Sequence, residues 1–386
     1  MARFSSTRAI QARRCSASNI CVAFDPGEIA EEWRSLEETG HATVFQTRRW
    51  LEPLARIAAP AEGAEPFFVL VREKTTGAPQ MLLPLCLHRR GGIRAIEFLD
   101  LGASDYNAPL IASGFRPRPS EFAALWSSIS AALPPADILR IDKSPGAIAG
   151  APNPLVHLRF MRRLALGAWG VVLPQTREAY ESETLSARFR KELRRKRRRL
   201  EECGAARLVC ARDADESIGM LRELAEMRRA RYAALGRHDI LDLAAFRAFY
   251  EDLLARENGF AEIRALEVDG LRVAIQFGLR RAEAFHFLLS GFRGDEWARK
   301  SVGGVAADMM IAQAIEDGLS AFDFTIGNAP YKRHFGAARQ DLFGGAQALS
   351  YRALPEVAER RLKGSLRTFL LPPAQPRAVT SRDHWR

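Results

Sequence analysis

Residues 301–332, SVGGVAADMMIAQAIEDGLSAFDFTIGNAPYK, decide how this chain folds and where its chemistry is expected. The apolar run predicts a helix over 305–315, and the alternating run that follows predicts a strand over 321–326. Ser301 is a good N-cap residue for that helix, and Gly318 suits the position after its end. The stretch therefore predicts a loop, a buried helix and a strand in immediate succession.

Gly303 and Gly304 stand at the predicted helix entrance. The free N–H groups and the positive dipole end of a helix start attract phosphate, and glycine lets a ligand approach the backbone closely. We therefore expect Val302, Gly303, Gly304 and Val305 to bind a phosphate-bearing cofactor. The plain alternative is an ordinary loop that enters a buried helix. No P-loop lysine follows, and the third glycine of a Rossmann fingerprint is absent.

Other motifs resemble one GNAT-related family, the acetyltransferase-like group associated with bacterial cellulose and other polysaccharide biosynthesis. The resemblance covers roughly residues 30–350, and it departs at the phosphate loop, where the family usually has Pro-Gly. Its motifs are the basic segment 188–204 (RFRKELRRKRRRLEECG), Phe322–Phe324 through Gly327, Tyr331-Lys332, Phe45–Trp50, Leu83–Leu85 and Asp105-Tyr106.

This resemblance implies an α/β fold of tandem GNAT-like units, with mixed sheets flanked by helices and a degenerate first unit. It implies an N-acyltransferase that uses acyl-CoA, such as acetyl-CoA, as co-substrate and needs no metal. The pyrophosphate would lie at 302–305. The pantetheine arm would lie between the strands 284–290 and 321–326, beside Leu288 and Ser290. The implied pathway is polysaccharide or cell-envelope metabolism.

Three residues are catalytic candidates. Asp323 lies between two phenylalanines and faces either the site or an ion-pair partner, Lys332 or Arg333. His286 alternates with Phe285 and Phe287 and so faces away from them; a lone strand histidine is more often structural. The resemblance implies that Tyr331 protonates the leaving thiolate, and the alternative is a packing role.

Residues 188–199 hold nine Arg or Lys against one Glu, in a chain of net charge +11. The segment predicts a helix with Ser186 as its cap, a thin apolar stripe and Gly204 after its end. Its basic face, with Arg194 and Arg198, is expected to bind substrate or an anionic lipid surface, or to be merely solvated. Lys332 is a further candidate for an anionic substrate, or a surface charge. Nucleic acid is disfavoured, because no zinc-finger or helix-turn-helix signal accompanies the patch. The apolar stripe consists of Phe189, Leu193 and Leu200.

The chain reads as two related halves. Hairpin signals, strongest at Asp269-Gly270, separate strands in both halves, and a helical region over 215–258 precedes the second set. A Pro-containing segment, 144–154, is the expected linker zone. The predicted boundaries are a disordered extension over 1–24, a degenerate GNAT-like domain over 25–160, a GNAT acyltransferase domain over 161–355, and a loose tail over 356–386.

Composition favours a cytoplasmic enzyme. No apolar run approaches the ~20 residues that span a bilayer, and the five cysteines show no C-x-x-C or zinc spacing. Two other functions stay open. One is a Fem-type ligase that takes aminoacyl-tRNA, whose acceptor arm would contact 188–199. The other is a non-catalytic module of the same fold that docks on a membrane or a synthase.

Overall fold

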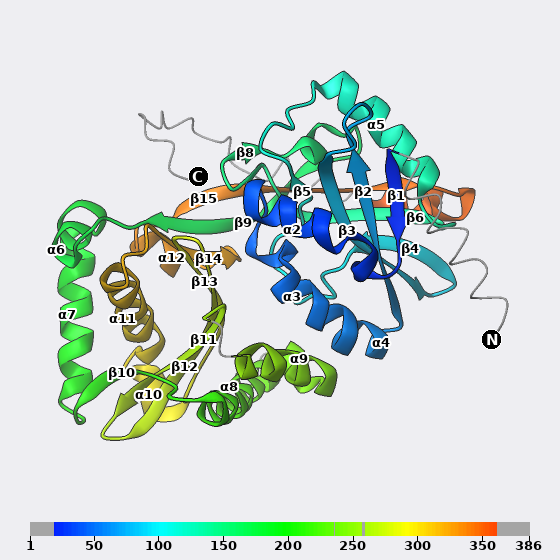
Figure 1. The fold of residues 1–386 in the computed structure, drawn as a ribbon. Helices are drawn as coiled ribbons and strands as arrows, with labels where there is room; N and C mark the ends of the chain where they lie inside the picture. Colours follow the sequence, from blue (N-terminus) through cyan, green and yellow to red (C-terminus); the bar gives the residue numbers. More distant parts are fainter. Residues whose placement is uncertain (1–18, 235, 257–258, 361–386) are drawn as a thin grey trace. The chain divides into compact units, whose positions relative to one another are not determined.

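The computed structural model describes residues 19–234, 236–256 and 259–360 (Figure 1). The chain divides into two compact units at 166/167 and 340/341, so the first unit contains segments from both ends of the sequence and the second is continuous. The domain boundaries expected at 160 and 355 fall near these positions. Residues 341–355, however, lie in the first unit and not in the second.

The first unit is built on a sheet with strand order β1-β2-β3-β4-β6-β15, in which β5 pairs with β3. All neighbours are antiparallel except β4 and β6, which run parallel through two rungs, Ala95↔Ile138 and Ile96↔Leu139. A separate small hairpin joins β7 and β8. The strands are β1 Ile20–Ala23, β2 Ala64–Arg72, β3 Pro79–Arg90, β4 Ile93–Phe98, β5 Leu110–Ile111, β6 Ile138–Pro145, β7 Ala147–Ile148, β8 Ala151–Pro152 and β15 Ala338–Ala348.

Helices of the first unit connect β1 to β2 and β4 to β6. The core between them and the sheet includes Phe67, Phe122 and Ile141, each almost fully buried. Residues 354–360 are also helical. The helical segments are η1 Pro26–Ile29, α2 Ala30–Thr39, η2 Val44–Gln46, α3 Arg48–Pro53, η3 Leu54–Ala58, α4 Ala59–Ala61, α5 Pro119–Ala132, η4 Pro154–His157 and η7 Tyr351–Ala353.

The second unit repeats this plan with strand order β9-β14-β13-β12-β11-β10. Again all neighbours are antiparallel except one pair, β13 and β14, which run parallel. The mixed α/β architecture with flanking helices therefore confirms the predicted fold class. The strands are β9 Arg162–Val172, β10 Ala206–Cys210, β11 Ala261–Val268, β12 Leu271–Arg281, β13 Ala284–Phe292 and β14 Ala321–Ile326.

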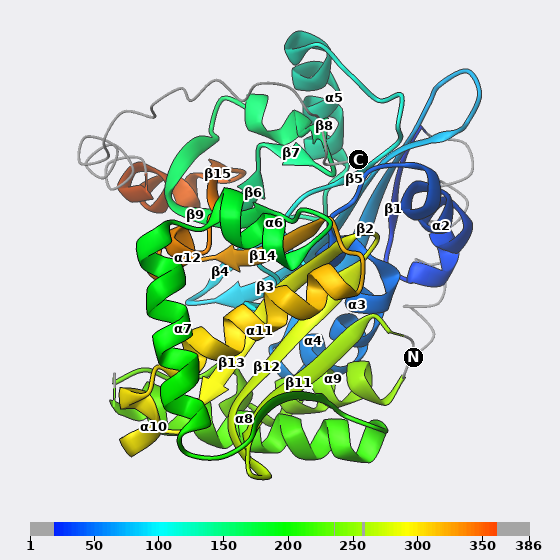
Figure 2. The same ribbon diagram turned by 90° about the vertical axis from the view of Figure 1, so that its left-hand side faces the viewer.

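Helices cover both faces of the second sheet (Figure 1). On one face, α11 packs on Phe285, Phe287 and Phe322, and α7 lies outside α11 (Figure 2). On the other face lies α8, because a Cβ at Gly291 would meet Leu224 of that helix at 2.8 Å. The helical segments are α6 Arg177–Ala179, η5 Tyr180–Thr184, α7 Ala187–Glu201, α8 Ala214–Ala234, η6 Ile240–Asp242, α9 Ala244–Ala255, α10 Asp295–Arg299, α11 Val302–Glu316 and α12 Tyr331–His334.

Local sequence explains the sharp ends of these elements. Asp269 and Gly270 both have positive φ, 47° and 81°, as a tight two-residue hairpin turn requires. At the end of α11, Gly318 has φ 73°, and its N–H donates to the carbonyl of Ile315 at 3.0 Å. The N–H of Leu319 donates to Ala314 at 2.9 Å, which completes a Schellman motif. The predicted role of Gly318 is therefore confirmed.

Two expectations about the chain's course were wrong. Residues 20–23 of the supposed extension form β1, which pairs with β2 along its whole length. The expected linker 144–154 lies inside the first unit, where Ser144, Ile148 and Asn153 are fully buried. Proline and glycine there shape a buried turn. The rest of the expected extension and the end of the tail lie outside the described residues.

Candidate functional site

The start of α11 differs from the expected loop. Gly303 and Gly304 lie inside the helix, and neither has a positive φ. The left-handed residue is Ser301, with φ 57° and ψ 37°; it occupies the N-cap position, but its side chain makes no cap hydrogen bond. Its carbonyl accepts from the N–H groups of Gly304 and Val305 at 2.9 and 3.2 Å. The N–H groups that a helix start leaves without an intrahelical acceptor are therefore those of the first two residues, 302 and 303.

The two glycines have different surroundings. A Cβ on Gly303 would meet the ring of Phe292 at 3.2 Å, so this glycine allows close packing of the helix on β13. A Cβ on Gly304 would meet nothing within 4 Å. Gly304 therefore faces open space at the positive end of the helix, which suits the approach of an anion.

Strands β13 and β14 separate beside this helix start. Their parallel pairing has only three rungs and ends at His286↔Asp323, although β13 continues to Phe292 and β14 to Ile326. Beyond this rung the facing edges share one side-chain bond, from Thr325 Oγ1 to the carbonyl of Phe287 at 3.2 Å. An unpaired edge presents backbone donors and acceptors to a ligand. We name the space between residues 287–292 and 324–326 the transfer gap.

A β-bulge in β13 turns additional backbone toward the transfer gap. In the register with β12, Phe287 pairs with Gly278 and Leu289 with Phe277, so Leu288 has no partner. An extra residue of this kind re-aims the strand, so the backbone groups of Leu288 and Ser290 point away from β12. The carbonyl of Ser290 accepts a hydrogen bond from Arg228 Nη1 at 3.1 Å, which fits that orientation.

His286 and Asp323 meet at the last paired rung, as side chains on the same face. The Nδ1 atom of His286 lies 3.2 Å from Asp323 Oδ2, and Asp323 Oδ1 accepts from the N–H of Thr325 at 2.7 Å. Both side chains are largely buried, 12% and 5% exposed. The left-handed φ of Thr325, 56°, creates the turn that brings its N–H back to the carboxylate. The contact with Asp323 therefore orients the imidazole of His286.

Tyr331 lies at the first position of α12, away from the rung of His286. Its ring packs edge-on against Phe324 and Phe335, with centroids 6.0 and 6.4 Å apart, and the residue keeps 42% of its surface exposed. The apolar surroundings raise the pKa of Tyr331, and the charge of Arg231 acts in the opposite sense. A raised pKa keeps the hydroxyl protonated at neutral pH, so Tyr331 can donate a proton but is a poor base.

The structure corrects the expectation for Lys332. Its side chain is buried, only 4% exposed, so it is not a surface charge. The ammonium donates to the carbonyls of Phe324, Thr325 and Ile326 at 2.9, 3.3 and 2.7 Å. These three bonds use the donors of a lysine. Lys332 therefore holds the end of β14 in its curved course and does not bind a substrate anion.

The basic segment is the predicted helix, α7. Ser186 caps it through a bond from the N–H of Phe189 at 3.2 Å, its apolar stripe is buried, and Gly204 follows with φ 140°. Arg194 and Arg198 are both exposed, and Arg194 pairs with Glu181 at 3.1 Å. Their binding to a substrate stays a prediction. The exposed cations of this helix are Arg188, Lys191, Arg194, Arg195, Arg197, Arg198 and Arg199.

Sequence reasoning missed Arg228, which is the main support of the site. It is 8% exposed and forms a two-point ion pair with Asp239, at 2.6 and 2.8 Å, besides its bond to Ser290. It also stacks on the ring of Tyr232 at 5.0 Å. Its position within the apolar spacing of α8, one turn after Leu224, was the available signal for burial. Nothing in the sequence pointed to Asp239 as its partner.

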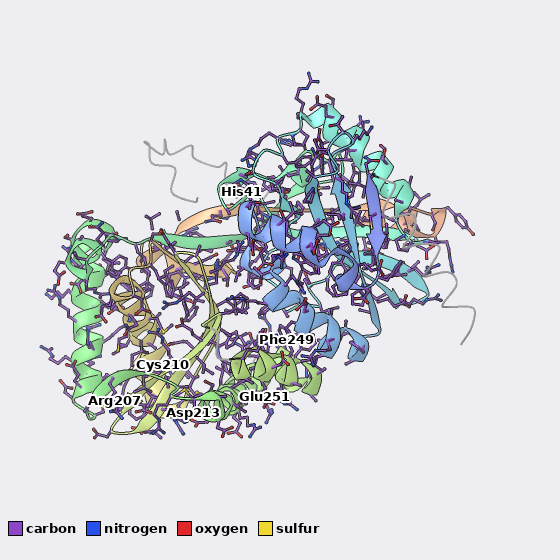
Figure 3. All side chains as sticks on the ribbon, viewed as in Figure 1. His41, Arg207, Cys210, Asp213, Phe249 and Glu251 are labelled. Atoms are coloured by element: carbon purple, nitrogen blue, oxygen red, sulfur yellow. The ribbon has the colours of Figure 1, made fainter. Side chains whose placement is uncertain are left out.

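Cys210 is remote from the transfer gap. Cys210 lies on edge strand β10, at the opposite side of this sheet from β14, near Arg207 and Asp213 (Figure 3). Burial raises the pKa of its thiol, which lowers the fraction of reactive thiolate. Among the described residues, no group of three or more His, Cys, Asp or Glu side chains is arranged to hold a metal ion. None of the described helices is long and apolar enough to span a bilayer.

Comparison with known proteins identifies the domain that carries the site. Residues 187–333 match the profile of a family described as "Acetyltransferase (GNAT) domain". No curated protein matches the chain. The matched range begins with α7 and includes the transfer gap, Gly304 and Tyr331.

Several solved structures are similar over most of the chain. FemX is 11% identical with a TM-score of 0.59, covering 85% of this chain and 98% of its own. The C-terminal domain (DUF2156) of a putative lysylphosphatidylglycerol synthetase from Agrobacterium fabrum is 11% identical with a TM-score of 0.52, covering 91% and 99%. A tandem GNAT protein from the clavulanic acid biosynthesis pathway is 13% identical, with a TM-score of 0.49 and coverage of 85% and 98%. At these identities the first two likenesses establish a shared fold, and residues 187–333 match the family model of a GNAT acetyltransferase domain.

Proposed function

We propose that the second unit transfers an acyl group from acyl-CoA to an amine, or a hydroxyl, of an acceptor. The observation that carries this proposal is the transfer gap, because two adjacent parallel strands separate directly beside the start of a buried helix. An extended thiol arm fits the edge of β13 beyond His286, and its pyrophosphate fits the helix start at 302–304. The match to the GNAT domain family supports the same reaction class.

The backbone of β13 supplies the electrostatic part of the reaction. The N–H of Leu288 is turned toward the gap by the bulge and is placed to polarise the thioester carbonyl. A fixed backbone donor stabilises the negative charge that develops on that oxygen in the transition state. Arg228 restrains the same strand through the carbonyl of Ser290.

Side chains of β13, β14 and α12 supply proton transfer. The acceptor nitrogen attacks the thioester carbon, the C–S bond breaks, and the acyl group is left on nitrogen. His286, oriented by Asp323, takes the proton that the nitrogen loses, and Tyr331 gives a proton to the departing thiolate. In this proposal the pair and the tyrosine come from different elements, and one acts as the base while the other acts as the acid.

The alternative donor is an aminoacyl-tRNA. The exposed cations of α7 favour it, because seven of them lie within 188–199, a length of about 17 Å along a helix. That charge exceeds what the few phosphates of one CoA molecule need, and arginine suits phosphate contacts. FemX shares the fold, and Fem-type ligases take aminoacyl-tRNA, as the resemblance in the sequence implies.

A titration decides between the donors. We expect acetyl-CoA or a longer acyl-CoA to bind the whole protein with micromolar affinity and to raise its melting temperature, because a ligand that binds only the native state stabilises it. Gly304→Val should keep the fold, since space is free there, and should lose this binding. Ser120→Val, at the second position of α5, is the matched control in the first unit.

Three results would change the conclusion. Binding of aminoacyl-tRNA without binding of any acyl-CoA would establish the alternative donor. No binding of either would leave the non-catalytic module of the same fold. Unchanged acyl-CoA affinity in Gly304→Val would show that the phosphates lie elsewhere. A role in polysaccharide or cell-envelope metabolism rests on the sequence resemblance alone, and an acceptor from that chemistry is part of the proposal.

A further inference from the structure

A cavity of about 370 Å³ lies within the second unit, between α8 and the segment that joins β13 to α11. It falls within the ~300–1,000 Å³ usual for small-molecule sites. Its walls come from Met227 and two glutamates of α8, from Phe292 and Arg293 at the end of β13, and from Trp297 of α10. Of these residues only Phe292 borders the transfer gap, and none supplies a group to the proposed acyl transfer.

Among the described residues that line the cavity, one acidic and one basic side chain have no ion-pair partner. Glu223 pairs with Arg272 at 2.7 Å, and Glu296 lies 3.5 Å from the ammonium of Lys300. Within the described part of the chain, Glu226 forms no ion pair, and the only bond of the Arg293 side chain goes to the carbonyl of Arg272, at 2.9 Å. Glu226 and Arg293 are exposed and do not pair with each other, although both line the cavity. A ligand that carries a positive and a negative charge would give Glu226 and Arg293 an ion-pair partner each.

The remaining wall is apolar and aromatic. Phe292 and Trp297 are half-buried, and each ring already holds a cation over one face, Arg231 at 5.0 Å and Lys300 at 4.8 Å. Met227 adds a flexible apolar contact that adapts to irregular shapes. An apolar side chain of moderate size therefore has a surface to cover between the two charges.

We propose that this cavity is a binding site for a zwitterionic α-amino acid with an apolar side chain. Glu226 pairs with the ammonium group, Arg293 with the carboxylate, and Phe292, Met227 and Trp297 surround the side chain. Planar guanidinium groups recognise carboxylates with two parallel bonds, which suits Arg293 to this role.

The cavity is a second site and not the acceptor position of the transfer reaction. Phe292 lies four positions after Leu288 on β13, a distance of about 13 Å at the rise of a β-strand. An amino acid held at Phe292 cannot place its amine on a carbonyl at Leu288. The inference therefore does not depend on the proposed acyl transfer.

Calorimetry on the full-length protein, without acyl donor, tests the site. We expect L-phenylalanine or L-leucine to bind. Phenethylamine, which lacks the carboxylate, and 3-phenylpropionate, which lacks the ammonium, should each bind about tenfold more weakly or worse, since bonds to charged groups contribute ~1.5–3 kcal/mol. Absence of binding of both amino acids at millimolar concentration would overturn the proposal. Equal binding of all the ligands would do so too, because an apolar cleft alone would explain it.

Two variants should show crossed effects. Glu226→Gln should weaken L-phenylalanine and phenethylamine but not 3-phenylpropionate, and Arg293→Gln should weaken L-phenylalanine and 3-phenylpropionate but not phenethylamine. Both side chains are exposed, so folding should survive. Asp215→Asn and Arg222→Gln, on α8 outside the cavity, are the matched controls. If each variant weakened the binding of all three ligands equally, Glu226 and Arg293 would not be the groups that bind the ammonium and the carboxylate.

Competition with acetyl-CoA separates this inference from the proposed function. We expect saturating acetyl-CoA to leave the affinity for L-phenylalanine unchanged. Displacement would place the cavity on the donor's path and overturn the second site. Binding of the amino acid without binding of any acyl-CoA would leave this site in place and remove the proposed function.

Discussion

The two units have the same strand plan but differ in how far the chain itself occupies the space beside their parallel strands. In each, one parallel pair, β4–β6 or β13–β14, is held by only two or three rungs before the strands separate. In each, the later strand of the pair contains a residue with positive φ, Lys143 at 57° or Thr325 at 56°. Each unit therefore contains a short parallel strand pair whose strands separate after two or three rungs.

In the first unit the chain fills that space itself. The N–H of Asn107 donates to the carbonyl of Lys143 at 3.1 Å, and its side-chain amide donates to the carbonyl of Asp142 at 2.9 Å. The ammonium of Lys143 donates to the carbonyl of Ser104 at 2.6 Å and pairs with Asp100. These contacts satisfy the backbone that an open gap offers to a ligand.

The helices that connect the two parallel strands, α5 in the first unit and α11 in the second, also differ in what they offer a ligand. Helix α5 carries Glu121 in its first turn, and this carboxylate accepts from the N–H of Arg118 at 2.9 Å. A carboxylate at this position complements the helix dipole and repels phosphate. Helix α11 has Gly304 at the equivalent third position and no acidic residue in its first turn. The two helix starts therefore differ in what they offer an anion: open space at Gly304 in α11 and a carboxylate at Glu121 in α5.

The largest effect on catalysis is expected from Tyr331→Phe. The variant keeps the ring between Phe324 and Phe335, so acyl-CoA affinity should barely change. Loss of the proton donor should lower turnover by roughly 10²–10⁴. Tyr106→Phe, near the filled gap of the first unit, should leave turnover nearly unchanged. Steady-state kinetics with a separate binding titration would check this, and full activity in Tyr331→Phe would return that residue to a packing role.

Arg228→Ala should cause the largest loss of stability. It leaves the carboxylate of Asp239 buried without its partner, and breaking such a pair typically costs about 3–5 kcal/mol. Urea unfolding at neutral pH measures the loss. Arg222→Ala, which breaks the pair between exposed Arg222 of the same helix and Glu251 of α9, should cost less than about 1 kcal/mol. Arg228→Met with Asp239→Leu should recover much of the stability, and no recovery would mean that packing, not charge, is what Arg228 supplies.

Acid should weaken the first unit through Glu97. Burial would raise the pKa of Glu97, but hydrogen bonds from His88 and Arg140 outweigh it and lower the pKa to about 2. A depressed carboxyl pKa contributes stability that is present above the unfolded value near 4.5 and is lost as the pH falls toward 2. The loss should reach at most about 3 kcal/mol.

In the second unit, Asp308 is a carboxylate whose pKa is shifted in the opposite direction from that of Glu97. Burial raises the pKa of Asp308 despite its pair with Arg177, so protonation of Asp308 favours the folded state as the pH falls through that raised value.

Because Glu97 is the group that loses stability in acid, Glu97→Gln should flatten that loss, measured by urea unfolding between neutral pH and pH 3. An unchanged acid profile in this variant would contradict the role of Glu97.

The smallest effect on folding is expected from reversing the charge of α7. Arg194, Arg195, Arg197 and Arg198 are exposed, so their replacement by Glu should leave the circular dichroism spectrum unchanged. Binding of the native protein to anionic phospholipid vesicles should fall with salt, because exposed charges are screened beyond ~10 Å at 0.1 M, and the variant should bind roughly tenfold more weakly. An unfolded variant would make the helix structural. A response to tRNA and not to vesicles would favour the aminoacyl donor.

Local signals were enough to predict elements whose partners are close in sequence. The strand 261–268, the Asp269-Gly270 turn and α7 with its cap at Ser186 agree with the structure, because periodicity and capping residues lie within each segment. The strands at 284 and 321 were predicted as well, and so was the orientation of His286 away from its two phenylalanine neighbours.

Long-range partners were beyond such reasoning. The bulge at Leu288 arises from register with β12, and the buried pair of Arg228 and Asp239 joins a helix to a distant turn. Lys332 looked like a ligand or a surface charge, because nothing in its neighbourhood shows that β14 curves back over its ammonium. Residues 341–348 looked continuous with the second unit, but they pair with β6 of the first.

The discontinuous first unit has a consequence for biosynthesis. Its strand β15 is translated only after the whole of the second unit, so β6 has no antiparallel partner along that edge while the ribosome makes residues 167–340. The second unit is continuous and can complete its own core first. We expect the nascent first unit to expose an adhesive strand edge during that interval. Slow synthesis or truncation after residue 340 should therefore lead to aggregation through the first unit, whose sequence comes first but whose folding finishes last.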